Sequence, residues 1–162
     1  HKARTGSVVG TPGTSEISNA ALLALPCDVL IPAALENQIR RDNAAAVRAR
    51  LVAEAANGPT TPAADEILFR RGVPVLPDIL ANSGGVCVSY FEWVQNLENQ
   101  QWDLDEVNHK LQVKMERAVD AVIDKQRQMN DRQPGTVDLR TAALILAIER
   151  VASVALKRGI WP

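Results

Sequence analysis

Small and polar residues follow three short apolar segments of the sequence, in positions that could bind a ligand. Ala33 and Ala34 end the first segment, Asn57 ends the second, and Asn82 comes just beyond the third. A carboxamide both donates and accepts hydrogen bonds, and small residues let a flat ligand approach the backbone. If the segments are parallel strands, their ends lie at one edge of a sheet, where open α/β sheets bind ligands. The pattern therefore predicts a polar cleft at this edge.

A helical pattern begins directly after the third of these positions. Gly84 and Gly85 open it, and Val86, Ser89 and Trp93 recur on one face at spacings of three and four. Backbone N–H groups at the positive end of this helix can face a ligand. We therefore expect Ser89, one turn in from the glycines, to face the same cleft or the core beside it.

Each of these residues could instead have a purely structural role. The sequence pattern alone does not decide between that role and ligand binding. Asn57 and Asn82 can satisfy the backbone of turns, and the glycine pair can permit close packing of a helix on a strand. Ser89 can donate to a carbonyl of the preceding turn. Tyr90, Phe91 and Trp93 are interpreted as core residues.

No other motif of known chemistry stands out. The two histidines and two cysteines do not cluster, so no metal site is expected, and His109 is interpreted as a solvated side chain. The cysteines are interpreted as buried, reduced thiols. Neither G-x-S-x-G nor a phosphate-binding P-loop occurs, so no catalytic residue is assigned.

Three apolar segments read as strands covered on both faces, because their apolar residues run continuously instead of alternating. They are "CDVLIPAA", "RLVAEAAN" and "GVPVLPDIL", at 27–34, 50–57 and 72–80. Helices are predicted between them, at 43–50 and from the N-cap Thr61 through Pro62 to the C-terminal Gly72. The order predicts a right-handed βαβαβ unit.

The second half of the sequence is helical. Asp103 and Glu106 form a capping-box pattern that opens one long helix, and a last helix is predicted from Leu139 to Lys157. A short helix is also expected at 18–24. The last helix is apolar nearly all round, so we expect a surface outside this chain to cover part of it.

Composition limits the partners of the protein. The 162 residues hold 18 basic and 19 acidic side chains, which leaves no excess of positive charge for nucleic acid. The longest apolar run, 22–35, is broken by Pro26 and Pro32, so no membrane-spanning helix is expected. No signal peptide is recognised, and a cytoplasmic location is expected. The chain starts at His1 without a Met, which suggests a fragment.

Four stretches resemble the carboxyl-terminal half of hexameric enzymes of the glutamate/leucine/phenylalanine/valine dehydrogenase family, and of its glutamate branch in particular. They are "DVLIPAALENQI", "VAEAANGPTTPAADEIL", "VLPDILANSGGVCVSYFEWVQN" and "DLRTAALILAIERVASVALKRGIWP". The resemblance implies a homohexameric oxidoreductase that converts L-glutamate reversibly to 2-oxoglutarate and ammonia with NAD or NADP. Two alternatives stay open: a leucine- or valine-type dehydrogenase fragment, and a truncated, non-catalytic binding module.

The resemblance also implies roles for single residues. Those matching the cofactor-binding positions, near the nicotinamide, are Ala33, Ala34, Asn57 and Asn82. Ser89 matches the residue that holds the substrate's side-chain carboxylate, and Val86 lies beside it. Because an apolar substrate offers nothing for a hydroxyl to bind, Ser89 disfavours the leucine-type alternative.

The implied fold is α/β: the second half of a Rossmann-like domain with a doubly wound, mainly parallel sheet, followed by carboxyl-terminal helices. Residues 1–83 would form the partial dinucleotide-binding domain, and 84–162 the helical segment that packs on it and toward a substrate domain. That substrate domain, with its catalytic lysine and aspartate, and the Gly-rich fingerprint are missing from the sequence. We therefore expect the chain alone to be inactive, to bind dinucleotide weakly and to self-associate.

Overall fold

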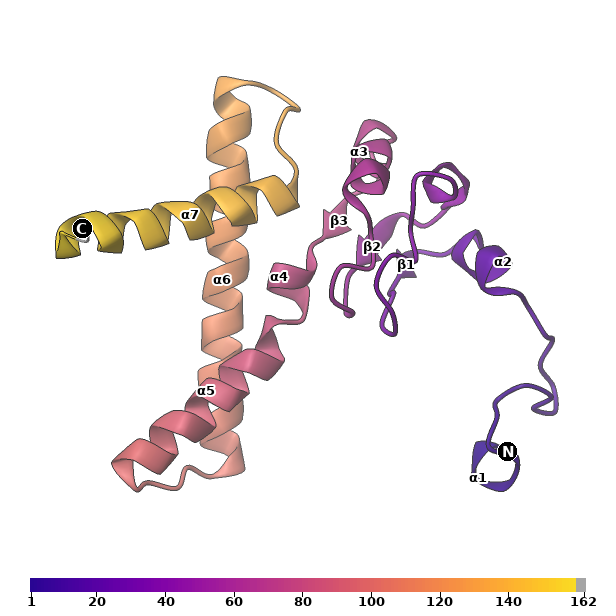
Figure 1. Cartoon of the computed structure of the whole chain (residues 1–162), viewed down its shortest axis with the longest axis horizontal. Helices are drawn as coiled ribbons and strands as arrows, with labels where there is room; N and C mark the ends of the chain where they lie inside the picture. Colours follow the sequence, from indigo (N-terminus) through magenta and orange to yellow (C-terminus); the bar gives the residue numbers. More distant parts are fainter. Residues whose placement is uncertain (160–162) are drawn as a thin grey trace.

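The computed structural model describes residues 1–159, which form two distinct regions (Figure 1). One region is a small sheet with short helices around it, and the other is an assembly of long helices toward the C-terminus. Two further helices, α1 (Lys2–Thr5) and α2 (Asn19–Leu23), precede the sheet. The side chain of Ser18 caps α2 by accepting a hydrogen bond from the Ala21 N–H, which confirms the short helix expected there.

The sheet consists of three parallel strands in the order β1-β2-β3. Their bounds are Val29–Leu30 for β1, Leu51–Ala53 for β2 and Val75–Leu76 for β3. Val52, in the middle of β2, pairs with Leu30 on one side and with Val75 on the other. The predicted parallel arrangement is confirmed, although each strand is shorter than its apolar segment.

The two connections between strands differ. The second contains α3 (Pro62–Arg70), where Pro62 takes the first helical position and Gly72, just beyond the helix, has a φ of +70°. This confirms the helix and its C-terminal glycine, but the side chain of Thr61 makes no capping hydrogen bond. Because Gly72 adopts the left-handed conformation, the chain can turn directly into β3.

The helix predicted at 43–50 is wrong. Only a 3₁₀ turn, η1 (Ala44–Ala46), forms there. The Asn43 side chain accepts from the Arg40 N–H at 2.7 Å and donates to the Gln38 carbonyl at 2.8 Å, which fixes a turn instead of a helix. The chain then extends, and the Arg50 N–H bonds the Cys27 carbonyl at 3.1 Å as part of the sheet. Tertiary pairing overrides the helix propensity of the alanines here.

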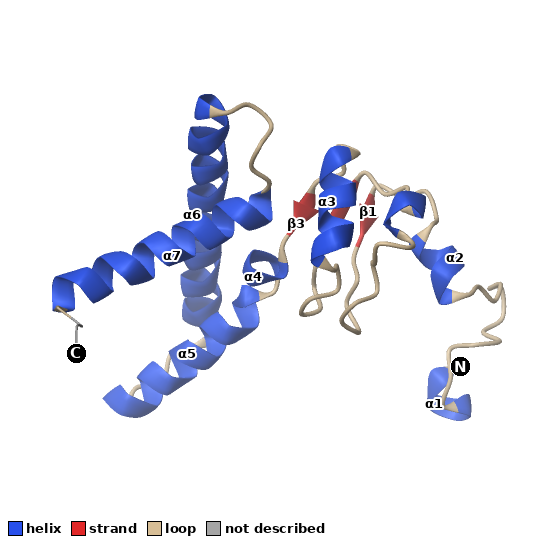
Figure 2. Cartoon of the chain, turned by 45° about the horizontal axis from the view of Figure 1, so that its top comes forward, coloured by secondary structure: helices blue, strands red, loops and turns tan. Residues whose placement is uncertain are grey.

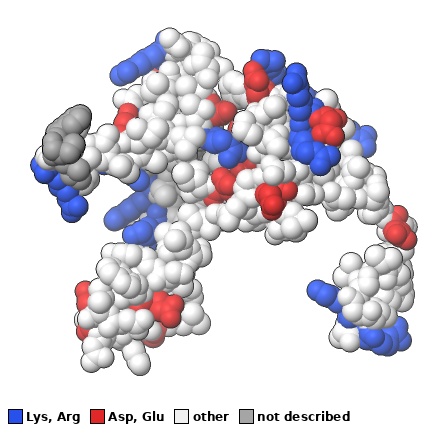
Figure 3. Space-filling view, viewed as in Figure 1, with Lys and Arg blue, Asp and Glu red and all other residues white. Residues whose placement is uncertain are grey.

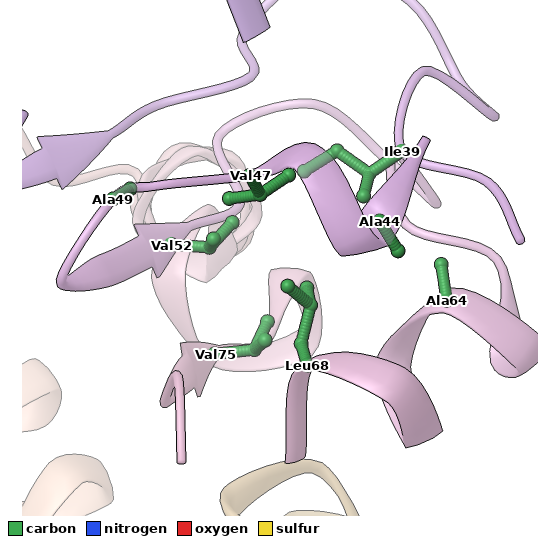
Figure 4. Packing of buried hydrophobic residues seen from close by; sticks show 8 residues of the cluster. All are labelled: Ile39, Ala44, Val47, Ala49, Val52, Ala64, Leu68 and Val75. Atoms are coloured by element: carbon green, nitrogen blue, oxygen red, sulfur yellow. The ribbon is translucent and has the colours of Figure 1, made fainter. Parts of the chain in front are cut away.

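The core of this region lies between the sheet, η1 and α3 (Figure 4). Ile39 and Leu68, its largest side chains, are fully buried, and so is Val52 of the central strand. Burying one such side chain contributes about 1.5–3 kcal/mol. The core therefore fixes β2 and α3 relative to each other, and with them the loop that joins them.

The third strand is shorter than the predicted segment, which ran to residue 80. β3 ends at Leu76, and a one-turn helix, α4 (Asp78–Ala81), follows it. Pro77 has no N–H to continue the ladder, and the Asp78 carboxylate accepts from the Ile79 N–H at 2.7 Å, as acids do in first helical turns.

Three long helices complete the fold, and α7 crosses α6 (Figure 2). They are α5 (Ser83–Glu98), α6 (Leu104–Arg132) and α7 (Leu139–Arg158). Asp103 caps α6 by accepting from the Glu106 N–H at 2.8 Å, and Asp138 caps α7 by accepting from the Thr141 N–H at 2.6 Å. The start of α6 and the extent of α7 confirm the prediction.

A second apolar cluster attaches the helices to the sheet region. Leu80 of α4 packs with Val122 of α6 and with Ala142 and Ala143 of α7. Beyond this cluster much apolar surface is exposed, notably Ile148 at 65% and Val151 at 71%. No helix within residues 1–159 is both long enough and apolar enough to cross a membrane.

The interpretation of the α5 aromatics as core residues is only partly right. Phe91 is buried, but Tyr90 and Trp93 are 51% and 56% exposed because α6 covers only one face of α5. His109 is exposed, as expected. The two cysteines are free, and each is half-buried instead of fully buried.

Candidate functional site

The loops that follow the three strands lie together at the carboxyl edge of the sheet. Ala33 and Ala34 follow β1, Asn57 and Gly58 follow β2, and α4 with Asn82 follows β3. The parallel order places these loops side by side, since all three strands end at the same edge. This edge is the candidate functional site.

An exposed carboxamide, Asn57, and a half-buried one, Asn82, meet at this edge. The Asn82 Nδ2 donates to the Asn57 Oδ1 at 2.7 Å and to the Ala55 carbonyl at 3.3 Å. Within residues 1–159, the Asn57 Nδ2 and the Asn82 Oδ1 have no hydrogen-bond partner. The pair therefore leaves one donor and one acceptor unpaired, and these are the two kinds of group that another carboxamide can bind.

An apolar cavity of about 360 Å³ adjoins the end of β1. Ala33, Ala34 and Pro32 form one side of it, and Leu22 and Leu23 of α2 form another. Ala33 and Ala34 are exposed, so their small side chains leave the backbone accessible. A planar ring can therefore approach this edge without displacing a large side chain.

Asp78 holds the loop that carries Asn57. Its Oδ2 accepts from the Gly58 N–H at 2.8 Å. Gly58 has a φ of +55°, a backbone conformation that side-chain-bearing residues adopt only with strain. The Asp78 N–H in turn donates to the Glu54 Oε2 at 2.9 Å. The β2 and β3 loops are therefore fixed to each other by hydrogen bonds in both directions.

An ionic cluster behind these loops was not predicted from the sequence. Arg140, near the start of α7, donates to Glu54 and to Asp65 at 2.7 Å each and to Asp78 at 3.4 Å. The Glu54 side chain is completely buried. A signal was present in the sequence, since a Glu within an apolar segment is rarely buried without a partner of opposite charge. The partner is 86 positions away, however, and no local pattern identifies it.

Burial acts on the charges of this cluster. It raises the pKa of Asp65 above its ordinary value, and the hydrogen bond from Arg140 offsets only part of that rise. Burial by itself lowers the pKa of Arg140, but the hydrogen bonds to Glu54 and Asp65 outweigh it and the net pKa is raised. Arg140 therefore stays cationic at every working pH.

Val86 and Ser89 lie on the exposed face of α5, one turn apart. Val86 is 68% exposed. Within residues 1–159, the Ser89 hydroxyl makes no hydrogen bond to the preceding turn or to either Asn, so the helix does not use it. The structure brings Asn57 and Asn82 into contact and leaves Ser89 free on the neighbouring helix.

A larger cavity, of about 730 Å³, lies outside this edge, among α5, α6 and the side chain of Arg150. Aromatic and cationic side chains line it, and Lys110 lies 4.5 Å from the Trp102 ring centroid. Basic side chains are visible in the hollow between α7 and α5 (Figure 3). No group of His, Cys, Asp and Glu within the described residues could hold a metal ion.

A parallel sheet with ligand-type side chains at its carboxyl edge, followed by packed helices, defines a Rossmann-like α/β protein. The sequence pattern of the Glutamate/Leucine/Phenylalanine/Valine dehydrogenase family matches residues 1–159, and the chain belongs to this family.

Similar proteins agree with this membership. The chain is 52% identical over 162 residues to the glutamate dehydrogenase of Thermotoga maritima, covering 100% of this chain and 38% of that protein. It is also 52% identical to the NADP-specific glutamate dehydrogenase A1 of Halobacterium salinarum, over 99% of this chain and 38% of that protein. It is 49% identical to an NAD-specific glutamate dehydrogenase of Staphylococcus aureus, over 88% of this chain and 33% of that protein. The chain thus spans little more than a third of its relatives' length.

A solved structure shows the same architecture. The hetero-hexameric glutamate dehydrogenase from Thermus thermophilus, in its Leu-bound form, superimposes with a TM-score of 0.85 at 35% identity. The match covers 99% of this chain and 36% of the Thermus chain. The sheet and the three long helices therefore form one continuous segment of a larger dehydrogenase fold.

Proposed function

We propose that this chain forms the nicotinamide-facing part of a glutamate dehydrogenase, which converts L-glutamate reversibly to 2-oxoglutarate and ammonia with NAD or NADP. The family membership and the glutamate dehydrogenase relatives support this proposal. The observation that carries it is the Asn57–Asn82 contact at the carboxyl edge of the sheet. Relatives with either cofactor specificity support both NAD and NADP.

The residues at this edge fit a nicotinamide. Its carboxamide has one acceptor and one donor, which match the Asn57 Nδ2 and the Asn82 Oδ1. Ala33 and Ala34 leave room for the ribose and the ring beside β1. The dinucleotide supplies the hydride chemistry when bound. The chain's own contribution is to hold the nicotinamide end in one orientation against the substrate.

Ser89 and Val86 are proposed to contact the substrate. A hydroxyl that the helix does not use can donate to the side-chain carboxylate of glutamate, with Val86 against the methylene groups. A leucine- or valine-type enzyme would leave this hydroxyl without a partner in the complex. The free state of Ser89 therefore favours the glutamate branch over that alternative.

Residues 1–83 are proposed as part of the dinucleotide-binding domain and 84–162 as a helical segment that also faces a substrate domain. The exposed apolar side chains of α7 support this division, because a covering surface is needed for them. An oligomeric enzyme, a homohexamer, and a cytoplasmic location are part of the same proposal. The hetero-hexameric assembly of the Thermus relative supports an oligomer.

A chimeric enzyme tests the proposal. The matching segment of the Thermotoga maritima enzyme is replaced by these 162 residues, and glutamate-dependent reduction of NAD and NADP is measured after the hybrid is shown to be folded and assembled. We expect activity with at least one cofactor, and none from the 162-residue chain alone. A folded, assembled hybrid without activity contradicts the proposal, and so does a hybrid that prefers leucine or valine.

A further inference from the structure

Arg140 connects three separate elements of the sheet region to the start of α7. Its Nη2 donates to Glu54 after β2, its Nε to Asp65 of α3, and its Nη1 contacts Asp78 at the start of α4. Among these acids, Glu54 is completely buried. A planar guanidinium can hold several carboxylates in fixed directions at once, which a flexible ammonium cannot.

The contacts continue from Arg140 to the carboxamides of Asn57 and Asn82. Asp78, the acid nearest the loops, also accepts from the Gly58 N–H at 2.8 Å. Gly58 follows Asn57 directly, and Asn57 contacts Asn82 at 2.7 Å. Glu54 reaches the same place by another route, because its Oε2 accepts from the Asp78 N–H. The loops after β2 and β3 are thus both hydrogen-bonded to Glu54 or Asp78, the carboxylates that contact Arg140.

We propose that Arg140 is a positioning residue for the candidate site at the carboxyl edge of the sheet. Arg140 fixes Asp78, and through the turn at Gly58 it sets the orientation of the Asn57–Asn82 pair. Within residues 1–159, Arg140 makes no hydrogen bond to Asn57 or Asn82 itself, and its partners are Glu54, Asp65 and Asp78. This inference rests on the proposed function only for the identity of the ligand. The geometric part concerns this chain's own residues and stands without any ligand.

Apolar contacts also attach α7. Ala142 and Ala143 are buried in one cluster with Leu80 and Val122, so the helix has a second means of attachment besides the ionic cluster. Replacing a buried ionic cluster with apolar residues of similar volume often leaves stability unchanged or higher. Asp78, one of the carboxylates that Arg140 holds, accepts a hydrogen bond from the loop that carries Asn57 and Gly58. We therefore expect the loss of Arg140 to change the geometry of that loop most clearly.

The first experiment uses NMR on the 162-residue chain. The backbone amide of Gly58 and the side-chain amide of Asn82 report on the network directly through their chemical shifts and hydrogen exchange. We expect Arg140→Lys to keep the fold and the charge opposite Glu54 but to move both signals, since the contact to Asp78 is lost. Arg140→Met should move them further and speed exchange at Gly58 about tenfold or more.

Arg71 provides a matched control. It donates to the carbonyls of Ala44 and Val47 at 2.7 Å each, at the opposite edge of the sheet. Arg71→Met therefore removes two short hydrogen bonds of an arginine without touching the candidate site. We expect it to lower stability and to leave the Gly58 and Asn82 signals in place.

The second experiment uses the chimeric enzyme. Misorientation of the nicotinamide affects hydride transfer more than overall cofactor binding, so Arg140→Lys should lower kcat about tenfold, with the KM for cofactor changed less than about threefold. Arg71→Met should change neither. An inactive parent hybrid contradicts the proposed function but leaves the NMR test of Arg140 intact. Unmoved Gly58 and Asn82 signals in Arg140→Lys, equal movement in Arg71→Met, or an unchanged kcat would overturn the positioning role.

Discussion

The sheet region and the helical region of this protein differ in how far their apolar side chains are buried. In the sheet region, Ile39, Val52 and Leu68 are fully buried by residues of the same region. In the helical region, α7 leaves Ile148 and Val151 largely exposed, and α5 exposes Trp93. The interior of the first region is closely packed, although Ile31 and Leu35 near β1 are also exposed, at 57% and 61%. The second region exposes apolar side chains along whole helices, as expected for the interface proposed above.

The largest effect is expected where the two regions meet. Arg140→Met leaves the completely buried Glu54 without its cationic partner, which should lower the free energy of unfolding by about 3–5 kcal/mol. Urea unfolding followed by circular dichroism measures the loss. The double variant Glu54→Gln/Arg140→Met removes both charges and should recover part of it. If the double variant is no more stable than the single one, the buried charge is not the cause.

A cavity in the sheet core should cost nearly as much. Leu68→Ala removes a fully buried side chain and should lower the free energy of unfolding by about 2–5 kcal/mol. Ile148→Ala, on the exposed face of α7, is the matched control and should change it by less than about 0.5 kcal/mol. Equal losses from the two substitutions would show that α7 is covered within this chain.

Self-association should follow from the exposed face of α7. Light scattering of the 162-residue chain at high concentration should show oligomers, because exposed apolar patches of this kind associate. Ile148→Glu/Val151→Glu places charges on that face and should restore the monomer. A strictly monomeric wild-type chain would contradict the expectation, as would oligomers that the double variant leaves unchanged.

The smallest effect concerns pH. Because burial raises the folded-state pKa of Asp65, its favourable contribution is complete below the unfolded-state pKa of about 4 and is lost as the pH rises through the folded-state value. Asp65→Asn should therefore make stability fall less steeply as the pH rises from about 4. Urea unfolding over that range measures the difference between the variant and the wild type. Identical slopes would show that Arg140 fully offsets the burial of Asp65.

Local patterns predicted much of the fold. Continuous apolar segments identified three parallel strands, and Asp103 and Gly72 marked helix ends because caps depend on neighbouring residues. The predicted helix at 43–50 failed because side-chain bonds of Asn43 and the pairing of β2 override alanine propensity. The exposure of Trp93 was missed, since an aromatic residue on the exposed face of a helix can have the same spacing as one in a core.

The sequence predicted the residues at the surface of the candidate site, but not the ionic cluster behind them. Asn57 and Asn82 were found because they follow strands of a parallel sheet, and the structure joins them. Arg140 was not found, because its partners Glu54 and Asp65 lie 86 and 75 positions away and no periodicity links such distant residues. The roles of Val86 and Ser89 stay predictions that depend on substrate.

The proposed substrate contact of Ser89 gives the most direct test of the account. In the chimeric enzyme, kcat/KM is measured for glutamate and for norvaline, which lacks the side-chain carboxylate, before and after Ser89→Ala. A hydrogen bond to a charged group contributes about 1.5–3 kcal/mol, so the glutamate value should fall about tenfold to over a hundredfold while the norvaline value changes little. Melting temperature controls for stability. An unchanged glutamate-to-norvaline ratio would contradict the account and make Ser89 a residue without a role in substrate binding.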